Sequence, residues 1–80
     1  MRIDKYLKIT RIIKRRTIAN EACDAGRVLV NEKVARASYE VKLGDRIEVN
    51  LGSKKICLEV LKICEYVKKD DADSMYRLIH

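Results

Sequence analysis

Apolar residues recur at helical spacing over the first sixteen positions of the chain. Ile3, Tyr6, Leu7, Thr10 and Ile13 fall on one side of a helix with about 100° between successive residues. The opposite side is basic and carries Lys5, Lys8, Arg11 and Arg15. This pattern predicts an amphipathic segment over residues 2–16, formed either as one helix or as a helix to about Ile9 followed by a basic turn.

A second short helix is expected before residue 26. Its narrow apolar stripe consists of Ile18, Ala19, Ala22 and Cys23. Thr10 and Thr17 are both candidate helix caps, because a threonine hydroxyl can accept a hydrogen bond from a free N–H group of the first turn. Gly26 is the expected stop, since glycine readily adopts the left-handed conformation that ends a helix.

After Gly26 the apolar period changes from helical to alternating. The pattern predicts two strands, at residues 28–30 and 33–35, around an Asn31-Glu32 turn. Glycine at the position of Glu32 would adopt the turn conformation with less strain. Asn31 tolerates a positive φ, which favours a type I′ turn. The chain therefore predicts a β-hairpin at this point.

Three further strands are expected in the second half of the chain. A turn at residues 43–45 introduces the alternating strand 47–51, and a turn at residues 52–54 leads into Ile56, Leu58 and Val60. The apolar parity then slips to Leu61 and Ile63, which predicts a bulge. A loop or single helical turn is expected around residues 68–73, and residues 75–79 can add a last strand.

Together these elements predict an α+β fold. Two short N-terminal helices pack on a small twisted antiparallel sheet of four to five strands, within one domain over residues 1–80. The chain is 48% hydrophobic but only 5% aromatic, with four Tyr and no Phe or Trp, so its core must be mainly aliphatic.

The net charge of +6 is concentrated in the first fifth of the chain. Residues 1–16 hold seven Lys and Arg against Asp4 alone, whereas residues 17–80 hold eleven cations and eleven anions. A local excess of this kind creates a positive potential that suits phosphates, anionic lipid or an acidic partner.

Other classes of protein fit the sequence poorly. The longest apolar run in residues 1–25 is Ile12-Ile13, and no stretch approaches the ~20 apolar residues of a membrane helix, so we expect a cytoplasmic protein that does not insert in a membrane. Cys23, Cys57 and Cys64 suit neither a disulfide framework nor a zinc site, and we expect reduced, mostly buried thiols.

Catalysis is not expected. The one histidine is His80, so no Ser/His or Cys/His pair can be built on a rigid element. Asp70, Asp71 and Asp73 lie beside two lysines in a polar segment, where solvated carboxylates are expected. No phosphate-binding glycine loop, metal motif or cofactor motif is present.

Among polyanions, nucleic acid is favoured over lipid. An interfacial helix needs a broad apolar face, but Ile3, Leu7 and Ile13 are required for the small core. Arginine suits bidentate contact with phosphate. Tyr6 is expected in the core, and the lack of Asn or Gln at base-reading positions favours recognition of phosphate and shape.

The chain resembles the RNA-binding domain named after small-subunit ribosomal protein S-four. The resemblance covers about residues 1–50 and departs from the family at Arg15, where Ser or Thr is usual, and at Glu32, where Gly is usual. Residues 12–17 and 68–76 resemble the subgroup of free-standing bacterial ribosome-associated quality control factors and related heat-shock RNA-binding proteins. The matching positions are Arg2, Ile3, Asp4, Leu7, Arg11, Arg16, Ala19, Gly26, Val28, Val30, Asn31, Val41, Gly44, Asp45, Ile47 and Val49.

This resemblance implies a non-enzymatic factor without a cofactor, with the domain core at residues 1–50 and the remaining strands and tail at 51–80. Such a factor binds large ribosomal subunits obstructed by peptidyl-tRNA and contacts large-subunit rRNA. It stabilises the tRNA in the P site while an elongation partner protein extends the stalled chain with alanines. We expect a monomer.

The expected RNA contacts lie in the basic segment and the hairpin. Asp4 is expected to orient a neighbouring cation, and replacing the exposed Arg16 is expected to weaken binding with little loss of stability. Two alternatives stay open: a general structured-RNA or assembly factor without preference for peptidyl-tRNA, and a module that docks on an acidic protein surface. The candidate RNA-binding residues are Arg2, Lys5, Lys8, Arg11, Lys14, Arg15, Arg16, Asn31 and Lys33.

Overall fold

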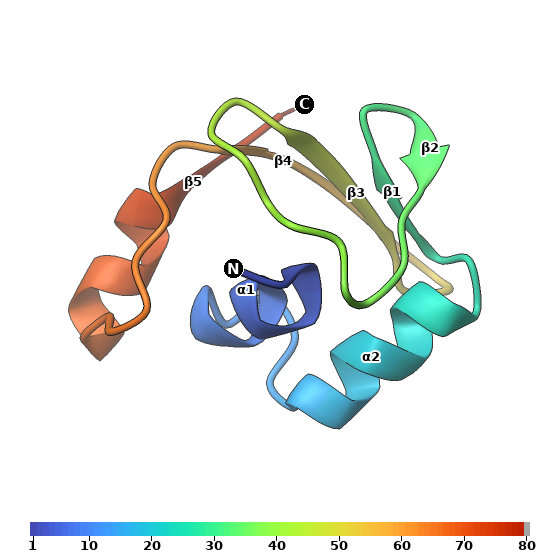
Figure 1. Cartoon of the computed structure of the whole chain (residues 1–80), viewed down its shortest axis with the longest axis horizontal. Coiled ribbons are helices and arrows are strands. Elements are labelled where there is room, and N and C mark those ends of the chain that lie inside the picture. Colours follow the sequence, from blue (N-terminus) through green and yellow to red (C-terminus); the bar gives the residue numbers. More distant parts are fainter. Residues whose placement is uncertain (80) are drawn as a thin grey trace.

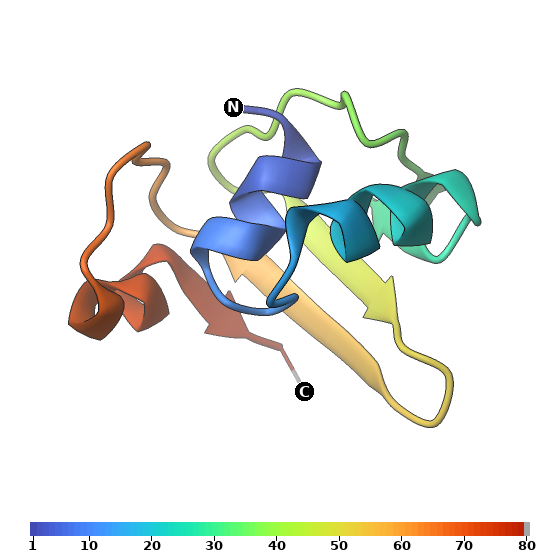
Figure 2. The same cartoon turned by 90° about the horizontal axis from the view of Figure 1, so that it is seen from below.

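Two helices lie against one face of a five-stranded antiparallel sheet in the computed structural model of the chain (Figures 1 and 2). The structure describes residues 1–79, and all of their side chains except those of Lys69 and Asp70; His80 lies outside the described residues. The strand order is β2-β1-β3-β4-β5, with every neighbouring pair antiparallel, which confirms the predicted α+β class. The elements are α1 (Ile3–Ile9), α2 (Arg16–Asp24), β1 (Val28–Val30), β2 (Lys33–Val34), β3 (Arg46–Asn50), β4 (Lys55–Val60), the 3₁₀ helix η1 (Lys69–Met75) and β5 (Tyr76–Leu78).

Helix α1 ends at Ile9, and a basic turn follows it. The five apolar-face residues predicted from the spacing are all buried. The Thr10 hydroxyl donates to the carbonyl oxygen of Tyr6 at 2.8 Å, so Thr10 closes the end of α1 and does not cap α2. Arg11 then adopts a left-handed φ of 64°, which turns the chain away from the helix axis. Of the two expected forms of residues 2–16, the helix followed by a turn is confirmed.

Helix α2 stops where glycine allows the backbone to reverse. Gly26 has a φ of 74°, its N–H bonds to the carbonyl oxygen of Cys23, and the N–H of Arg27 bonds to that of Ala22. This is the Schellman arrangement expected for a glycine stop. Thr17 lies inside α2, so the cap expected there is wrong. Of the expected apolar stripe, Ala19, Ala22 and Cys23 are buried, whereas Ile18 is 46% exposed.

The β1–β2 hairpin forms with the predicted two-residue turn. Val30 pairs with Lys33, and both intervening residues have positive φ, 51° at Asn31 and 72° at Glu32, as a type I′ turn requires. Glu32 therefore occupies a left-handed position without the freedom of glycine.

The core lies between the helices and the inner face of the sheet. The Tyr6 hydroxyl donates to the Met75 carbonyl oxygen at 2.9 Å, which ties α1 to the junction of η1 and β5. Tyr6 is fully buried, as expected, whereas Cys57 and Cys64 are only half-buried. The sheet contributes Val28, Val30, Ile47, Val49, Leu58 and Val60.

Strand β4 ends at Val60, immediately before the expected bulge. The N–H groups of Leu61 and Lys62 both donate to the Met75 carbonyl oxygen, a two-against-one pairing that lies beyond the strand. Leu61 consequently turns out to solvent and is 50% exposed. Within residues 1–79, no helix is long and apolar enough to cross a membrane.

Candidate nucleic-acid interface

A buried carboxylate organises the basic residues where the two helices begin. The side chain of Asp4 is 2% exposed and accepts hydrogen bonds from the Lys5 backbone N–H at 2.8 Å and the Asn20 amide at 3.3 Å. One nitrogen of Arg2 and one of Arg16 lie 3.3 Å and 3.4 Å from its two oxygens, and both arginine side chains stay about half exposed. The expectation that Asp4 orients neighbouring cations is confirmed.

Asp4 remains charged despite its burial. Burial by itself raises the pKa of this carboxyl group, but the hydrogen bonds from Asn20, Arg16 and the Lys5 N–H, together with the charge of Arg16, outweigh it and hold the pKa below its usual value. Arg16 is exposed, as expected, and it also contacts a buried carboxylate, so its effect on stability stays a prediction. Its removal would take one partner from a buried carboxylate.

The start of α2 adds to the same positive field. Arg15 occupies the N-cap position and makes no side-chain cap, so no side chain satisfies the first N–H groups of α2 there. A hollow of about 420 Å³ lies at this point, lined by Arg2, Asp4, Arg16, Thr17, Asn20 and Glu21. We call it the Arg2–Arg16 surface. Two guanidinium groups beside a helix N-terminus suit a phosphate group.

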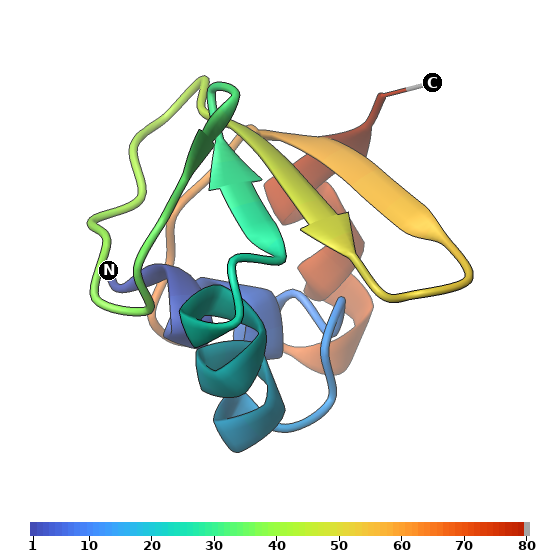
Figure 3. The ribbon, with the colours of Figure 1, turned by 90° about the vertical axis from the view of Figure 1, so that its right-hand side faces the viewer.

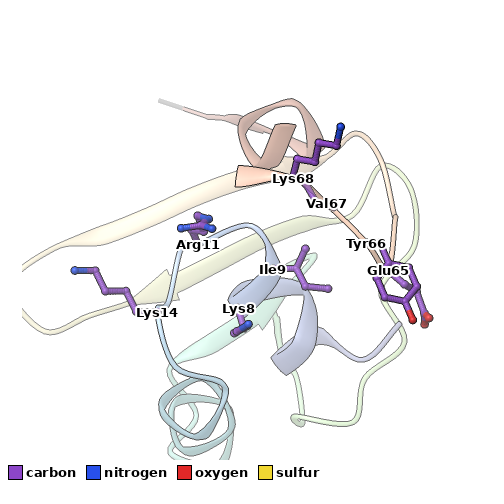
Figure 4. A pocket seen from close by; sticks show the side chains of 8 residues that line it. All are labelled: Lys8, Ile9, Arg11, Lys14, Glu65, Tyr66, Val67 and Lys68. Atoms are coloured by element: carbon purple, nitrogen blue, oxygen red, sulfur yellow. The ribbon is translucent and has the colours of Figure 1, made fainter. Parts of the chain in front are cut away.

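The other cations of the basic segment occupy different positions. Lys8, Arg11 and Lys14 line a second, larger hollow beside residues 65–68 (Figure 4). Lys5 is tied to Glu65 by an ion pair of 3.7 Å, and Arg15 is exposed but lines neither hollow. The structure thus divides the predicted basic face into two neighbouring surfaces.

The hairpin residues lie apart from both surfaces. The β1–β2 turn stands at the end of the sheet remote from α1 and α2 (Figures 1 and 3). The Asn31 amide donates to Asp45 at 3.1 Å and accepts from the Arg46 N–H at 3.1 Å, so it closes the hairpin onto β3. Lys33 is exposed. The structure therefore does not bring Asn31 and Lys33 together with the helical cations.

Sequence reasoning missed Asn20, Tyr66 and Lys68. The sequence pattern gives no signal for Asn20, because its contact with Asp4 depends on how α2 packs against α1. Tyr66 and Lys68 line the second hollow although they come fifty or more positions after the basic segment. For Tyr66 and Lys68, the only local signal in the sequence was a tyrosine close to two consecutive lysines.

The chain is similar in sequence to known proteins over nearly its whole length. Residues 1–47 match the S4 domain. The RQC P-site tRNA stabilizing factor of Streptococcus pneumoniae is 47% identical over 99% of this chain and 90% of its own length. The factor of the same name in Bacillus subtilis is 43% identical over 99% of this chain and 92% of its own.

The fold is shared with a solved structure. Heat Shock Protein 15 of Vibrio cholerae, described as trimeric, superposes with a TM-score of 0.91 at 28% identity, over 99% of this chain and 81% of that one. The similarity to the named factors extends well beyond residue 47 and includes β4, η1 and β5. The chain therefore belongs to the S4 domain family and, within it, to the group of RQC P-site tRNA stabilizing factors.

Proposed function

We propose that the chain is a non-enzymatic RNA-binding factor of ribosome-associated quality control that stabilises peptidyl-tRNA in the P site of obstructed large ribosomal subunits. The names of its relatives support the RNA target and the pathway. The observation that carries the proposal is the buried Asp4, which holds Arg2 and Arg16 beside the uncapped start of α2.

Binding would act through phosphate contacts. Each guanidinium group uses one nitrogen on Asp4 and keeps other N–H donors for an RNA phosphate. Lys5, Lys8, Arg11, Lys14 and Arg15 extend the positive field across the adjoining surface, with Asn31 and Lys33 as proposed contacts to a second RNA segment. If about five phosphates are neutralised, the logarithm of the binding constant falls against the logarithm of salt concentration with a slope of about −3.5 to −4.5.

The mechanism needs no chemical step. A protein that contacts large-subunit rRNA and tRNA together lowers the free energy of one tRNA position. In the proposed cycle the factor, as a monomer, holds the P-site tRNA while an elongation partner protein adds alanines to the stalled chain.

Co-sedimentation with large subunits tests this function. We expect the protein to bind subunits that carry peptidyl-tRNA more tightly than empty ones, and we expect Arg2→Ala to weaken that binding. Lys54→Ala, which removes one exposed charge from the β3–β4 turn, is the matched control and should bind like the wild type. Unchanged binding of Arg2→Ala would contradict the proposal, and equal affinity for empty and obstructed subunits would favour a general structured-RNA factor.

A further inference from the structure

A groove of about 830 Å³ opens between the basic turn after α1 and the segment that follows β4 (Figure 4). We call it the Tyr66 groove. Its volume lies within the roughly 300–1,000 Å³ range of small-ligand sites. Half of its lining comes from residues 65–68, outside the part of the chain that matches the S4 domain. Its lining residues are Lys8, Ile9, Arg11, Lys14, Glu65, Tyr66, Val67 and Lys68.

The groove carries an excess of positive charge. Of its five charged side chains four are cationic, and the exception, Glu65, is engaged by Lys5 at 3.7 Å. Among the described side chains, no carboxylate lies within 4.0 Å of a side-chain nitrogen of the four cations. Like charges gathered without counter-ions favour an anionic ligand.

The groove is also lined by an aromatic residue, Tyr66. Tyr66 is 94% exposed, whereas Tyr6 is completely buried. In Figure 4, Tyr66 and Glu65 lie on one side of the groove and Arg11 and Lys14 on the other. An exposed tyrosine face on one side of a groove and cations on the other can stack a nucleobase and hold the phosphates that flank it.

The backbone at Arg11 gives a second observation at this groove. Its φ of 64° is a left-handed conformation that glycine adopts freely and other residues disfavour. The chain nevertheless places a long cationic side chain there, and that side chain lines the groove. Glycine would fit this helix end with less strain, so the arginine found there supports a role of its side chain in the groove.

We propose that the Tyr66 groove binds one unpaired nucleotide of RNA, with its base stacked on Tyr66 and its flanking phosphates on Arg11, Lys14 and Lys68. This inference rests on the proposed RNA-binding function and adds base stacking to its phosphate contacts. A duplex offers only its phosphates to such a groove, because its bases are already stacked on one another. An unpaired base can instead use the open ring of Tyr66, so the groove selects single-stranded loops, bulges or ends.

Two RNAs separate this inference from the general function. One is a blunt RNA hairpin, and the other is the same hairpin with a three-nucleotide single-stranded 3′ overhang. Binding of the full-length protein to each is measured by fluorescence anisotropy at fixed salt. We expect the wild type to prefer the overhang, and we expect Tyr66→Ala to lose about 5- to 20-fold in affinity for it while binding the blunt hairpin as before.

Matched variants identify the contribution of the ring. Tyr66→Phe keeps the aromatic face and should retain the overhang preference. Because Tyr66 is almost fully exposed, its substitution should leave the thermal midpoint unchanged. A 5-iodouridine in the overhang should form a photo-crosslink to Tyr66, located by mass spectrometry of the digested complex.

The outcomes are distinct. If Tyr66→Ala keeps the wild-type preference for the overhang, or if polyglutamate binds the wild type as tightly as the overhang RNA does, the groove does not serve an unpaired nucleotide. If the wild type binds neither hairpin, the RNA-binding function itself fails. Binding of both RNAs, with an overhang preference that only Tyr66→Ala removes, supports both.

Discussion

Replacing Arg11 with glycine should stabilise the protein and weaken its binding to RNA. Arg11 has a φ of 64°, and a left-handed conformation costs a residue with a β-carbon roughly 1–2 kcal/mol. Glycine removes that cost but adds about 0.5–1 kcal/mol of backbone entropy to the unfolded chain. The free energy of unfolding should therefore rise by about 0.5–1 kcal/mol, and the thermal midpoint by about 2–8 °C for a domain of this size.

The same substitution removes a cation from the Tyr66 groove. Loss of one phosphate contact should make the slope of log K against log salt shallower by about 1. Unfolding followed by circular dichroism gives the stability, and fluorescence anisotropy over a salt series gives the slope. Opposite changes in stability and binding are the signature of a residue kept in a strained conformation for its ligand.

Arg11→Ala is the matched control for this prediction. Alanine also removes the charge, so the loss of binding should equal that of the glycine variant, but its β-carbon keeps the left-handed strain and the gain in stability should be absent. A glycine variant less stable than the wild type would refute the strain argument. An unchanged salt slope would refute the phosphate contact of Arg11.

Three further predictions follow from buried or strained groups. Asp4→Asn should lower the free energy of unfolding by about 1–3 kcal/mol at pH 7. Because the folded-state pKa of Asp4 is lowered, the difference in stability between wild type and variant should shrink as the pH falls below about 4. Urea titrations at several pH values measure this difference. Glu32→Gly should raise the urea midpoint, because it relieves a φ of 72° in the hairpin turn; a lower midpoint would contradict the type I′ assignment. Burial, together with the charges of Asp4 and Asp24, raises the pKa of the Cys23 thiol to about 11. Iodoacetamide at pH 8 should therefore modify the half-buried Cys57 and Cys64 before Cys23, and mass spectrometry measures the order.

Elements whose signals are local could be read directly from the chain. The spacing of Ile3, Tyr6 and Leu7 identified the buried side of α1, and Gly26 marked the end of α2. Alternation identified β3 and β4, because side chains in a strand point to opposite faces in turn. The roles of the two threonines could not be read this way. A threonine hydroxyl can bond a free N–H group ahead of it or a carbonyl oxygen behind it, and Thr10 does the latter.

The location of the excess positive charge in residues 1–16 and the aliphatic character of the small core can both be read from the chain alone. The division of that charge between two surfaces depends on how the elements pack. Arg2 and Arg16 gather around Asp4 because α2 packs beside α1, and Arg11 and Tyr66 line one groove because the chain returns after β4 to the end of α1. Residues far apart in the sequence become neighbours when the chain buries a shared core, and Tyr6 and Met75, both buried and joined by a hydrogen bond, are an example.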